Sequence, residues 1–269
     1  MSIPVIVSIT TLPSRIGRMR PCLDSLLAGD VVPDKIFVPV PKFSRREKCA
    51  YEIPAFLKNM DVYGGVVEVI EVEDDWGPGT KVLGSLGKIP EPCYLIAADD
   101  DVSYKPHFLA GLLAAQRSDH EASFSYHTYR ASGLTIGQGC DGFSFYSPNL
   151  RGAGDFYKKY VEGTDLFYHD DLWFSFFLFL RRIAVRRPAV GKNADPIYEI
   201  VHQINSMNVM PVVKKIRRSG VGMLLRATKP SLEKRFRLKA VDVFDRLITS
   251  PVRRLNRKVT QKKTGLWQR

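Results

Sequence analysis

Strand and helix patterns alternate along residues 3–118, and this alternation restricts the fold more than any other feature of the sequence. The strand segments are mostly apolar, as strands buried on both faces of a sheet are. Strands of this kind interleaved with helical segments predict an α/β fold whose mostly parallel sheet is flanked by helices. The predicted strands are 3–10, 35–41, 66–72 and 93–98, and the predicted helices are 14–29, 79–89 and 105–118.

Two prolines, Pro39 and Pro41, interrupt the second predicted strand. Because proline has no N–H to donate to a neighbouring strand, we expect this strand at the sheet edge. Further along the chain, residues 142–147 predict another strand, and residues 171–182 predict a buried helix opened by acidic residues. We assign all of these elements to one domain that covers residues 1–212.

Basic charge is concentrated at the C-terminal end. Residues 214–269 hold 18 Lys and Arg against 3 Asp and Glu, whereas residues 1–213 hold 22 basic and 25 acidic residues. The net charge of +12 therefore comes from a basic extension, which we predict to be helical over residues 213–269. Residues 231–248 place apolar side chains on one helix face. These are Leu232, Phe236, Ala240, Val243 and Leu247.

A basic amphipathic helix is typical of proteins that lie on an anionic membrane surface. Nucleic acid is the alternative partner for such charge. The extension has no zinc-ligand spacing, RNP motif or pair of recognition helices, and this favours the membrane.

Several features predict a cytoplasmic location. The four cysteines have no metal-ligand spacing and are interpreted as reduced thiols. The N-terminal segment is interpreted as a first strand, not a signal peptide. The most apolar run, residues 172–180, is far too short to span a bilayer. The cysteines are Cys22, Cys49, Cys93 and Cys140.

Three consecutive aspartates, Asp99, Asp100 and Asp101, follow the strand 93–98. Adjacent carboxylates repel one another, and burying one without a partner is costly. Either the triplet starts a solvated loop, or it binds Mg²⁺ or Mn²⁺ together with a substrate phosphate. Ligands of open α/β sheets bind beyond the carboxyl ends of the strands, and the triplet lies at such an end. The triplet therefore lies where a cation site that also binds a substrate phosphate would have to be.

The segment "TTLPSR" (residues 10–15) follows the first predicted strand, where a loop meets the start of a helix. Backbone N–H groups at a helix start bind phosphates, and Arg15 can add a charge-assisted contact. Thr10, Thr11 and Arg15 are therefore candidates for nucleotide binding. The alternative is a capped helix start without a ligand.

The segment "EDDWGPGTK" (residues 73–81) follows the third predicted strand. It lacks the GxxxxGK[ST] order of a phosphate-binding P-loop. Its glycines allow the backbone to approach a ligand closely, and Lys81 can reach a base or a phosphate from the next helix. Lys81 is therefore a further candidate for nucleotide binding.

The segment "HDDLW" (residues 169–173) places Asp170 and Asp171 directly before the predicted buried helix. One interpretation is structural, because acidic residues cap a helix and stabilise its positive end. The other is catalytic, because a carboxylate at this position can serve as a general base.

Taken together, "VSITTLPSRI", "WGPGTK", "AADDDVSY" and "HDDLW", in this order, resemble the GT-A glycosyltransferases. The likeness is to the family-2-like inverting enzymes of bacterial surface polysaccharide assembly, and it covers residues 3–180. It implies the Rossmann-like GT-A fold.

The resemblance also implies roles for the candidate residues. Asp99 and Asp101 fill a D-x-D motif that binds Mn²⁺ or Mg²⁺ with the nucleotide-sugar diphosphate, Asp101 on the metal and Asp99 nearer the ribose. Asp171 is the first choice for the base that deprotonates the acceptor, and Asp170 is the second. A C-terminal histidine often completes such a metal site, and His202 is the candidate here. The implied nucleotide-binding residues are Thr10, Thr11, Arg15, Lys81, Asp99 and Asp100.

The implied reaction is transfer of a hexosyl or N-acetylhexosaminyl group from a UDP-sugar to a glycan or lipid-linked glycan. The Q-x-x-R-W element of processive synthases is absent, which predicts transfer of a single sugar. With the basic extension, the resemblance implies a peripheral enzyme on the inner face of the cytoplasmic membrane. Two alternatives stay open: a Mg²⁺-dependent nucleotidyltransferase, which also uses Asp pairs on an α/β sheet, and a non-catalytic lipid- or nucleic-acid-binding protein.

Overall fold

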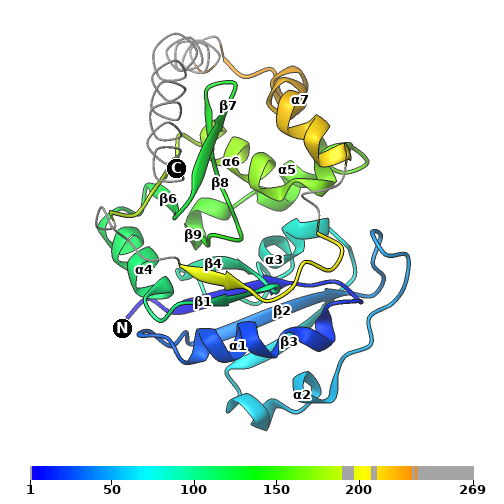
Figure 1. Ribbon diagram of the computed structural model, residues 1–269. Coiled ribbons are helices and arrows are strands. Elements are labelled where there is room, and N and C mark those ends of the chain that lie inside the picture. The colour runs from blue at the N-terminus through cyan, green and yellow to red at the C-terminus, as the bar shows by residue number, and fades with distance from the viewer. Residues whose placement is uncertain (1, 190–196, 207–210, 232–233, 235–269) are drawn as a thin grey trace, which may run out of the picture.

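The computed structural model describes residues 2–189, 197–206, 211–231 and 234. Its centre is a mixed seven-stranded sheet (Figure 1). The strands lie in the order β10 (Ala184–Arg186), β6 (Ala122–Ser125), β9 (Phe143–Tyr146), β4 (Tyr94–Asp99), β1 (Val5–Thr10), β2 (Lys35–Pro41) and β3 (Val67–Val72). Only β9 runs antiparallel to its neighbours in this described sheet. The predicted α/β fold with a mostly parallel sheet is confirmed.

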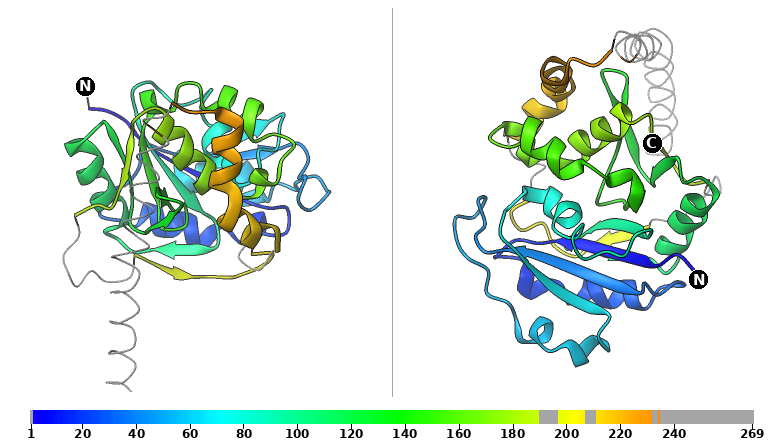
Figure 2. Two further views of the ribbon diagram at one scale, coloured as in Figure 1. Left: turned by 90° about the horizontal axis from the view of Figure 1, so that it is seen from above. Right: turned by 180° about the vertical axis from the view of Figure 1, so that it is seen from behind.

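Helices cover both faces of this sheet, and Figure 2 shows the sheet between the two layers when seen from behind. One layer contains α1 (Arg20–Leu27) and α4 (Phe108–Ser118). The other contains α3 (Thr80–Leu83), α5 (Ala153–Tyr160), α6 (Asp170–Leu180) and α7 (Pro211–Thr228). A short helix, α2 (Ala55–Lys58), lies near β3.

The remaining elements are short. Two small antiparallel sheets pair β5 (Val102–Tyr104) with β11 (Tyr198–Ile200), and β7 (Thr128–Ala131) with β8 (Leu134–Gly137). The 3₁₀ turns are η1 (Ile16–Arg18), η2 (Met60–Tyr63), η3 (Gly77–Gly79), η4 (Ser147–Leu150) and η5 (Asp165–Tyr168).

The apolar central strands explain the two helix layers. Successive side chains of a strand point to opposite faces of the sheet. Ile6 and Leu95 accordingly join the core beneath α6, while Val7 and Ile96 join the core beneath α1. Both faces of β1 and β4 are therefore removed from water, as the continuous apolar runs predict.

The strand with two prolines does not lie at the edge, so that prediction is wrong: β2 lies between β1 and β3. The N–H of Ile36 donates to the carbonyl oxygen of Val66 at 2.8 Å. Even-numbered residues of β2 therefore donate toward β3, and the odd-numbered prolines face β1. Pairing with β1 ends at Phe37, two residues before Pro39, so neither proline removes a hydrogen bond between the strands.

Two predicted helices are shorter in the structure. The segment 14–29 divides into η1 and α1, with Pro21 at the start of α1, where its missing N–H costs nothing. The segment 79–89 is helical only over α3, which ends at Gly84. A Cβ on Gly84 would lie 2.7 Å from the Cβ of Pro39, so this glycine permits close packing on β2.

The first part of the predicted basic extension, α7, packs on the domain. A Cβ on Gly220 would lie 3.0 Å from Cδ1 of Leu172, so the glycine lets α7 approach α6 closely. Ile216, Val221 and Leu224 of α7 are buried in the core beneath α6. The five apolar positions of the predicted amphipathic helix lie outside the described residues, and the division of the chain at 212/213 stays a prediction. No described helix combines the length and apolarity needed to cross a membrane.

Candidate active site

The parallel register of the central strands brings two predicted site segments together. Thr10, the last residue of β1, lies opposite Asp99, the last residue of β4. Because the strands are parallel, the loops that follow them leave the sheet at the same edge. The "TTLPSR" loop and the aspartate triplet are therefore neighbours, although 89 residues separate Thr11 from Asp100, to which its hydroxyl is hydrogen-bonded.

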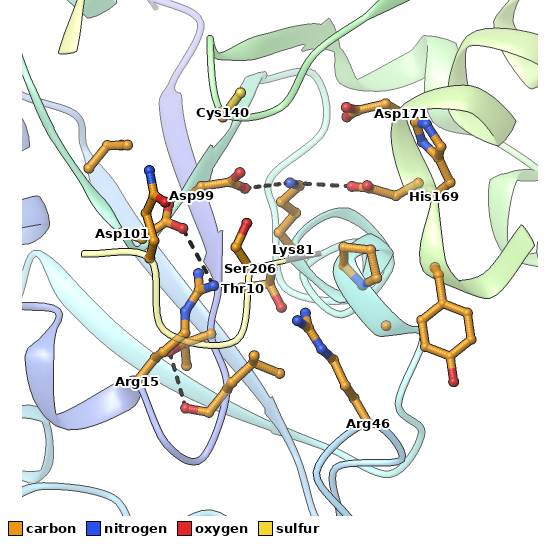
Figure 3. Close-up of a pocket in the computed structure, with 18 of the residues that line it drawn as sticks. Thr10, Arg15, Arg46, Lys81, Asp99, Asp101, Cys140, His169, Asp171 and Ser206 are labelled. Atoms are coloured by element: carbon orange, nitrogen blue, oxygen red, sulfur yellow. Dashed lines mark hydrogen bonds and ion pairs between the residues drawn. The ribbon is translucent and has the colours of Figure 1, made fainter. Parts of the chain in front are cut away.

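A cavity of about 360 Å³ opens at this edge (Figure 3). Its walls come from the loops after β1, β2, β3 and β4, the β8–β9 turn, the start of α6 and the segment around β11. This volume is in the usual range for small-molecule sites. The predicted site residues that line it are Thr10, Thr11, Arg15, Lys81, Asp99, Asp101, Asp170, Asp171 and His202. Asp100 is the only predicted site residue that does not line the described cavity.

Lys81 joins the two groups of predicted carboxylates. Its Nζ lies 2.7 Å from Oδ1 of Asp99 and 3.3 Å from Oδ2 of Asp170 (Figure 3). Burial opposes the charge of this ammonium, but the carboxylates of Asp170 and Asp99 outweigh that effect and raise the pKa of Lys81. Lys81 is therefore a buried cation that links the end of β4 to the start of α6.

The glycines of the Gly-Pro-Gly turn before Lys81 pack closely against other parts of the chain. Gly77 has φ +61°, and a Cβ there would lie 2.7 Å from the carbonyl oxygen of Phe167. A Cβ on Gly79 would lie 2.7 Å from Cζ2 of Trp173. These glycines let η5 and α6 pack against the turn, which places Lys81 beside Asp170. The close approach of a ligand to these glycines stays a prediction.

Asp171 is held in a different way from Asp170. Its Oδ1 accepts the N–H of Gly139 at 2.9 Å. Burial and the neighbouring charge of Asp170 raise the pKa of Asp171 well above its ordinary value, although Lys81 opposes this shift. A carboxylate with a raised pKa is a stronger base, which suits general-base catalysis near neutral pH. A Cβ on Gly139 would lie 2.5 Å from Nζ of Lys81, so a side chain there would displace the ammonium from its present position.

Asp100 belongs to a buried cluster behind the cavity wall. Its Oδ2 accepts the hydroxyl of Thr11 at 2.5 Å and Nε of Arg15 at 3.1 Å, and its Oδ1 is ion-paired with the same guanidinium. Arg15 also lies 3.4 Å from Oδ2 of Asp101. This geometry favours a role for Asp100 in positioning the loops. Its predicted contact with a nucleotide is a hypothesis that the arrangement of the side chain does not support.

Asp101 and His202 lie side by side on the cavity wall. The backbone oxygen of Asp101 accepts the N–H of Val201 at 2.8 Å, which places the next residue, His202, against it. Burial and the charge of Asp99 raise the pKa of Asp101. Neither ring nitrogen of His202 is hydrogen-bonded within the described part of the chain, although both are shielded from water.

The donor set in this wall suits a divalent cation in its chemistry. Two carboxylates with an unpartnered imidazole are ligands that Mn²⁺ accepts. In the described residues, however, no three His, Cys, Asp or Glu side chains already converge as a metal cluster. Lys81 and Arg15 instead neutralise Asp99 and Asp101, respectively.

A segment that we call the strap, residues 197–206, forms one side of the cavity. At its start β11 pairs with β5, directly after the aspartate triplet. At its end the Nδ2 of Asn205 donates to Oε1 of Glu47 at 2.6 Å and to Oγ of Ser14 at 3.2 Å. Glu47 in turn accepts the N–H and the hydroxyl of Ser14. The strap is thus fixed to the loops after β1 and β2.

Several lining residues were not predicted. Arg46, Tyr51 and Asp75 come from the loops after β2 and β3, and Gln138 and Cys140 come from the β8–β9 turn. Burial and the charge of Asp99 raise the pKa of the Cys140 thiol, so it is protonated at neutral pH. The sequence "FSRREK" around Arg46 has the composition of an ordinary solvated loop. Only the folded arrangement brings it to the cavity.

The fold is similar to that of solved glycosyltransferases. The mannosyltransferase PcManGT from Pyrobaculum calidifontis, in complex with GDP-Man and Mn²⁺, matches with a TM-score of 0.58 and 13% identity, over 92% of this chain and 71% of that one. TarS from S. aureus in complex with UDP-GlcNAc matches with a TM-score of 0.54 and 15% identity, over 91% and 73%. Its complex with UDP gives a TM-score of 0.53 and 16% identity, over 90% and 71%. No family model and no curated protein matches the sequence.

These similarities define the class of fold. The chain has the GT-A fold, with a Rossmann-like mixed sheet flanked by helices, as the sequence motifs imply.

Proposed function

We propose that this protein is a metal-dependent inverting glycosyltransferase that moves one sugar from a nucleotide-sugar to an acceptor hydroxyl. The observation that carries the proposal is the ion-pair bridge through Lys81. It holds Asp99 of the D-x-D motif and Asp170 of the "HDDLW" motif within one cavity. The residues that bind the sugar donor and the residue that acts as the base must face the same cavity. The leaving group departs from one side of the sugar while the acceptor attacks from the other.

The positions of the acids support the following reaction. The acceptor oxygen forms a bond to C1 of the sugar while the bond from C1 to the phosphate oxygen breaks. The electron pair of that bond leaves with the nucleoside diphosphate. The proton of the acceptor hydroxyl passes to Asp171, whose carboxylate the N–H of Gly139 orients. Attack opposite the leaving group inverts the configuration at C1.

Asp101, Asp99 and His202 are the residues that would hold a divalent cation, Mn²⁺ or Mg²⁺. When bound, this ion supplies positive charge to the departing diphosphate. Lys81 shares Asp99 with this site and adds a fixed positive charge beside it. The likeness to a mannosyltransferase solved with Mn²⁺ supports the assignment of the ion.

The first test is calorimetric titration of UDP and GDP into the wild-type protein with Mn²⁺ and then with EDTA. We expect UDP to bind in the presence of Mn²⁺ and at least 10-fold more weakly in EDTA, because an ion held by Asp101, Asp99 and His202 would add positive charge for the diphosphate, and a 10-fold change corresponds to about 1.4 kcal/mol. UDP is the first probe because the similar protein TarS was solved with UDP and with UDP-GlcNAc. PcManGT binds GDP-Man, so GDP is the second probe.

Two outcomes would contradict the proposal. If neither diphosphate binds under either condition, the nucleotide-sugar site is wrong, and the non-catalytic binding protein is the better hypothesis. If a nucleoside triphosphate is cleaved with release of pyrophosphate, the protein is a nucleotidyltransferase. A hexosyl or N-acetylhexosaminyl group is the proposed cargo, because the two similar structures hold GDP-Man and UDP-GlcNAc.

We further propose that the acceptor is a glycan or lipid-linked glycan, and that the enzyme is peripheral on the inner face of the cytoplasmic membrane. The excess of Lys and Arg after residue 213 supports this location, because each basic residue near an anionic surface contributes about 1 kcal/mol. We expect the full chain to cosediment with phosphatidylserine-containing vesicles at 50 mM salt and to be released by about 0.5 M salt. Equal binding to neutral vesicles would contradict it.

A further inference from the structure

The cationic side chains of the cavity differ in whether they form ion pairs with carboxylates. Three cationic side chains of the described residues line it: Arg15, Arg46 and Lys81. Lys81 is paired with Asp99 and Asp170. Arg15 is paired with Asp100 and, at a longer distance, with Asp101. Arg46 has no direct hydrogen bond or ion pair to any described residue, and only the Glu47 carboxylate, which is not in contact with it, favours its charge at longer range.

The surroundings of Arg46 explain why the protein does not neutralise it. Its neighbour in the sequence, Glu47, is occupied by Ser14 and Asn205. Burial and the positive charge of Arg15 together lower the pKa of Arg46, so the site penalises its charge. A half-buried guanidinium that has lost part of its hydration gains most from a bound anion.

We propose that Arg46 binds a phosphate oxygen of the nucleotide diphosphate; this rests on the proposed function. Figure 3 shows the guanidinium of Arg46 directed toward the middle of the cavity. A planar guanidinium matches two phosphate oxygens at once, which an ammonium does not. The matched cations Arg15 and Lys81 then serve mainly to hold the aspartates, while Arg46 recognises the ligand.

The test compares Arg46→Met with Arg45→Met. Arg45 is a matched control: it is the adjacent arginine, it is exposed, it does not line the cavity, and its guanidinium lies 4.7 Å from the centre of the Phe167 ring. Affinities for UDP are measured by calorimetry, and those for UMP and uridine by ligand-observed NMR, all with Mn²⁺. If the wild type selects guanine, GDP, GMP and guanosine replace them.

We expect Arg46→Met to weaken UDP binding by about 10- to 100-fold, in line with the loss of one charge-assisted hydrogen-bonded pair. Uridine affinity should stay within about 2-fold of the wild-type value, since uridine carries no phosphate. Arg46→Lys should restore part of the lost UDP affinity, because lysine keeps the positive charge but lacks the planar guanidinium that contacts two oxygens at once. Arg45→Met should match the wild type.

Other results would overturn the proposal. Equal losses for UDP and uridine would mean that Arg46 shapes the base pocket. An unchanged UDP affinity would also reject it, and a raised KM for the acceptor would then assign Arg46 to an anionic acceptor. If the wild type binds no nucleoside diphosphate, the proposed function fails separately. Inorganic pyrophosphate then tests Arg46 alone: weaker binding by Arg46→Met supports the anion site, and equal binding rejects it. Arg46→Gln replaces the methionine variant if that one does not fold.

Discussion

Asp171→Asn is expected to lower kcat by about 10²- to 10⁴-fold, the usual contribution of a positioned general base, while UDP affinity stays at the wild-type value. An amide cannot take the proton of the acceptor hydroxyl, but it keeps the shape of the carboxylate and its bond from the N–H of Gly139. In the wild type the raised pKa of Asp171 predicts that kcat/KM falls on the acid side at a pH above 3.8, the ordinary value of an aspartate. The measurements are single-turnover rates and a pH profile.

Asp170→Asn is the matched control, because the two acids are adjacent and only Asp170 is ion-paired with Lys81. Removing this charge also removes repulsion from Asp171, so the acid limb should move to lower pH. A larger loss of kcat in Asp170→Asn than in Asp171→Asn would exchange the two assignments. An undiminished rate in both variants would show that neither acid is the base.

Asp101→Asn is expected to reduce Mn²⁺-dependent UDP binding by at least about 100-fold, because the variant loses the charge of the carboxylate that is proposed to hold the ion. Binding measured in EDTA should change little. The fold should persist, since the side chain of Asp101 is partly exposed, 21%, and its nearest cation, Arg15, keeps its pair with Asp100. Calorimetry with and without Mn²⁺, with a thermal melt of each variant, measures both effects.

The neighbouring Asp100→Asn should give the opposite pattern. Asp100 is buried and carries two contacts from Arg15 and one from Thr11. Breaking a buried pair on one side destabilises by about 3–5 kcal/mol, which a lowered melting temperature would record. If Asp101→Asn melts early while Asp100→Asn keeps its stability, the division of roles within the triplet is wrong.

Much of the fold follows from local patterns in the sequence. Continuous apolar runs identify strands that are buried on both faces of the sheet. The pairing of Thr10 with Asp99 follows once β1 and β4 are parallel neighbours. The inner position of β2 does not follow locally. Its prolines would remove hydrogen bonds only if β1 paired with β2 as far as Pro39. Where this pairing ends depends on both strands and is not visible in the sequence of β2 alone.

The candidate site was only partly predictable for the same reason. The acidic and glycine-rich segments are visible as motifs, but the bridge through Lys81 depends on η5 and α6 packing against the turn at Gly77 and Gly79. Arg46 gives no local signal, because an arginine in a polar loop is usually solvated. Asp100 and Asp101 lie in the turn between β4 and β5, so the alternation of side chains along a strand does not predict that Asp100 leaves the cavity.

The strap is joined to α7 by a short stretch of chain. Ser206 ends the described strap and Pro211 begins α7, so five Cα–Cα steps of at most ~3.6 Å, about 18 Å in all, tether the cavity wall to that helix. Because α7 is packed on α6, which carries Asp170 and Asp171, the tether has one end on the helix layer that holds these two aspartates. A substitution that detaches α7 would release the wall from this anchor, while Asn205, the β5–β11 pairing and the ion pair of Glu199 with Lys105 would still attach it to the domain.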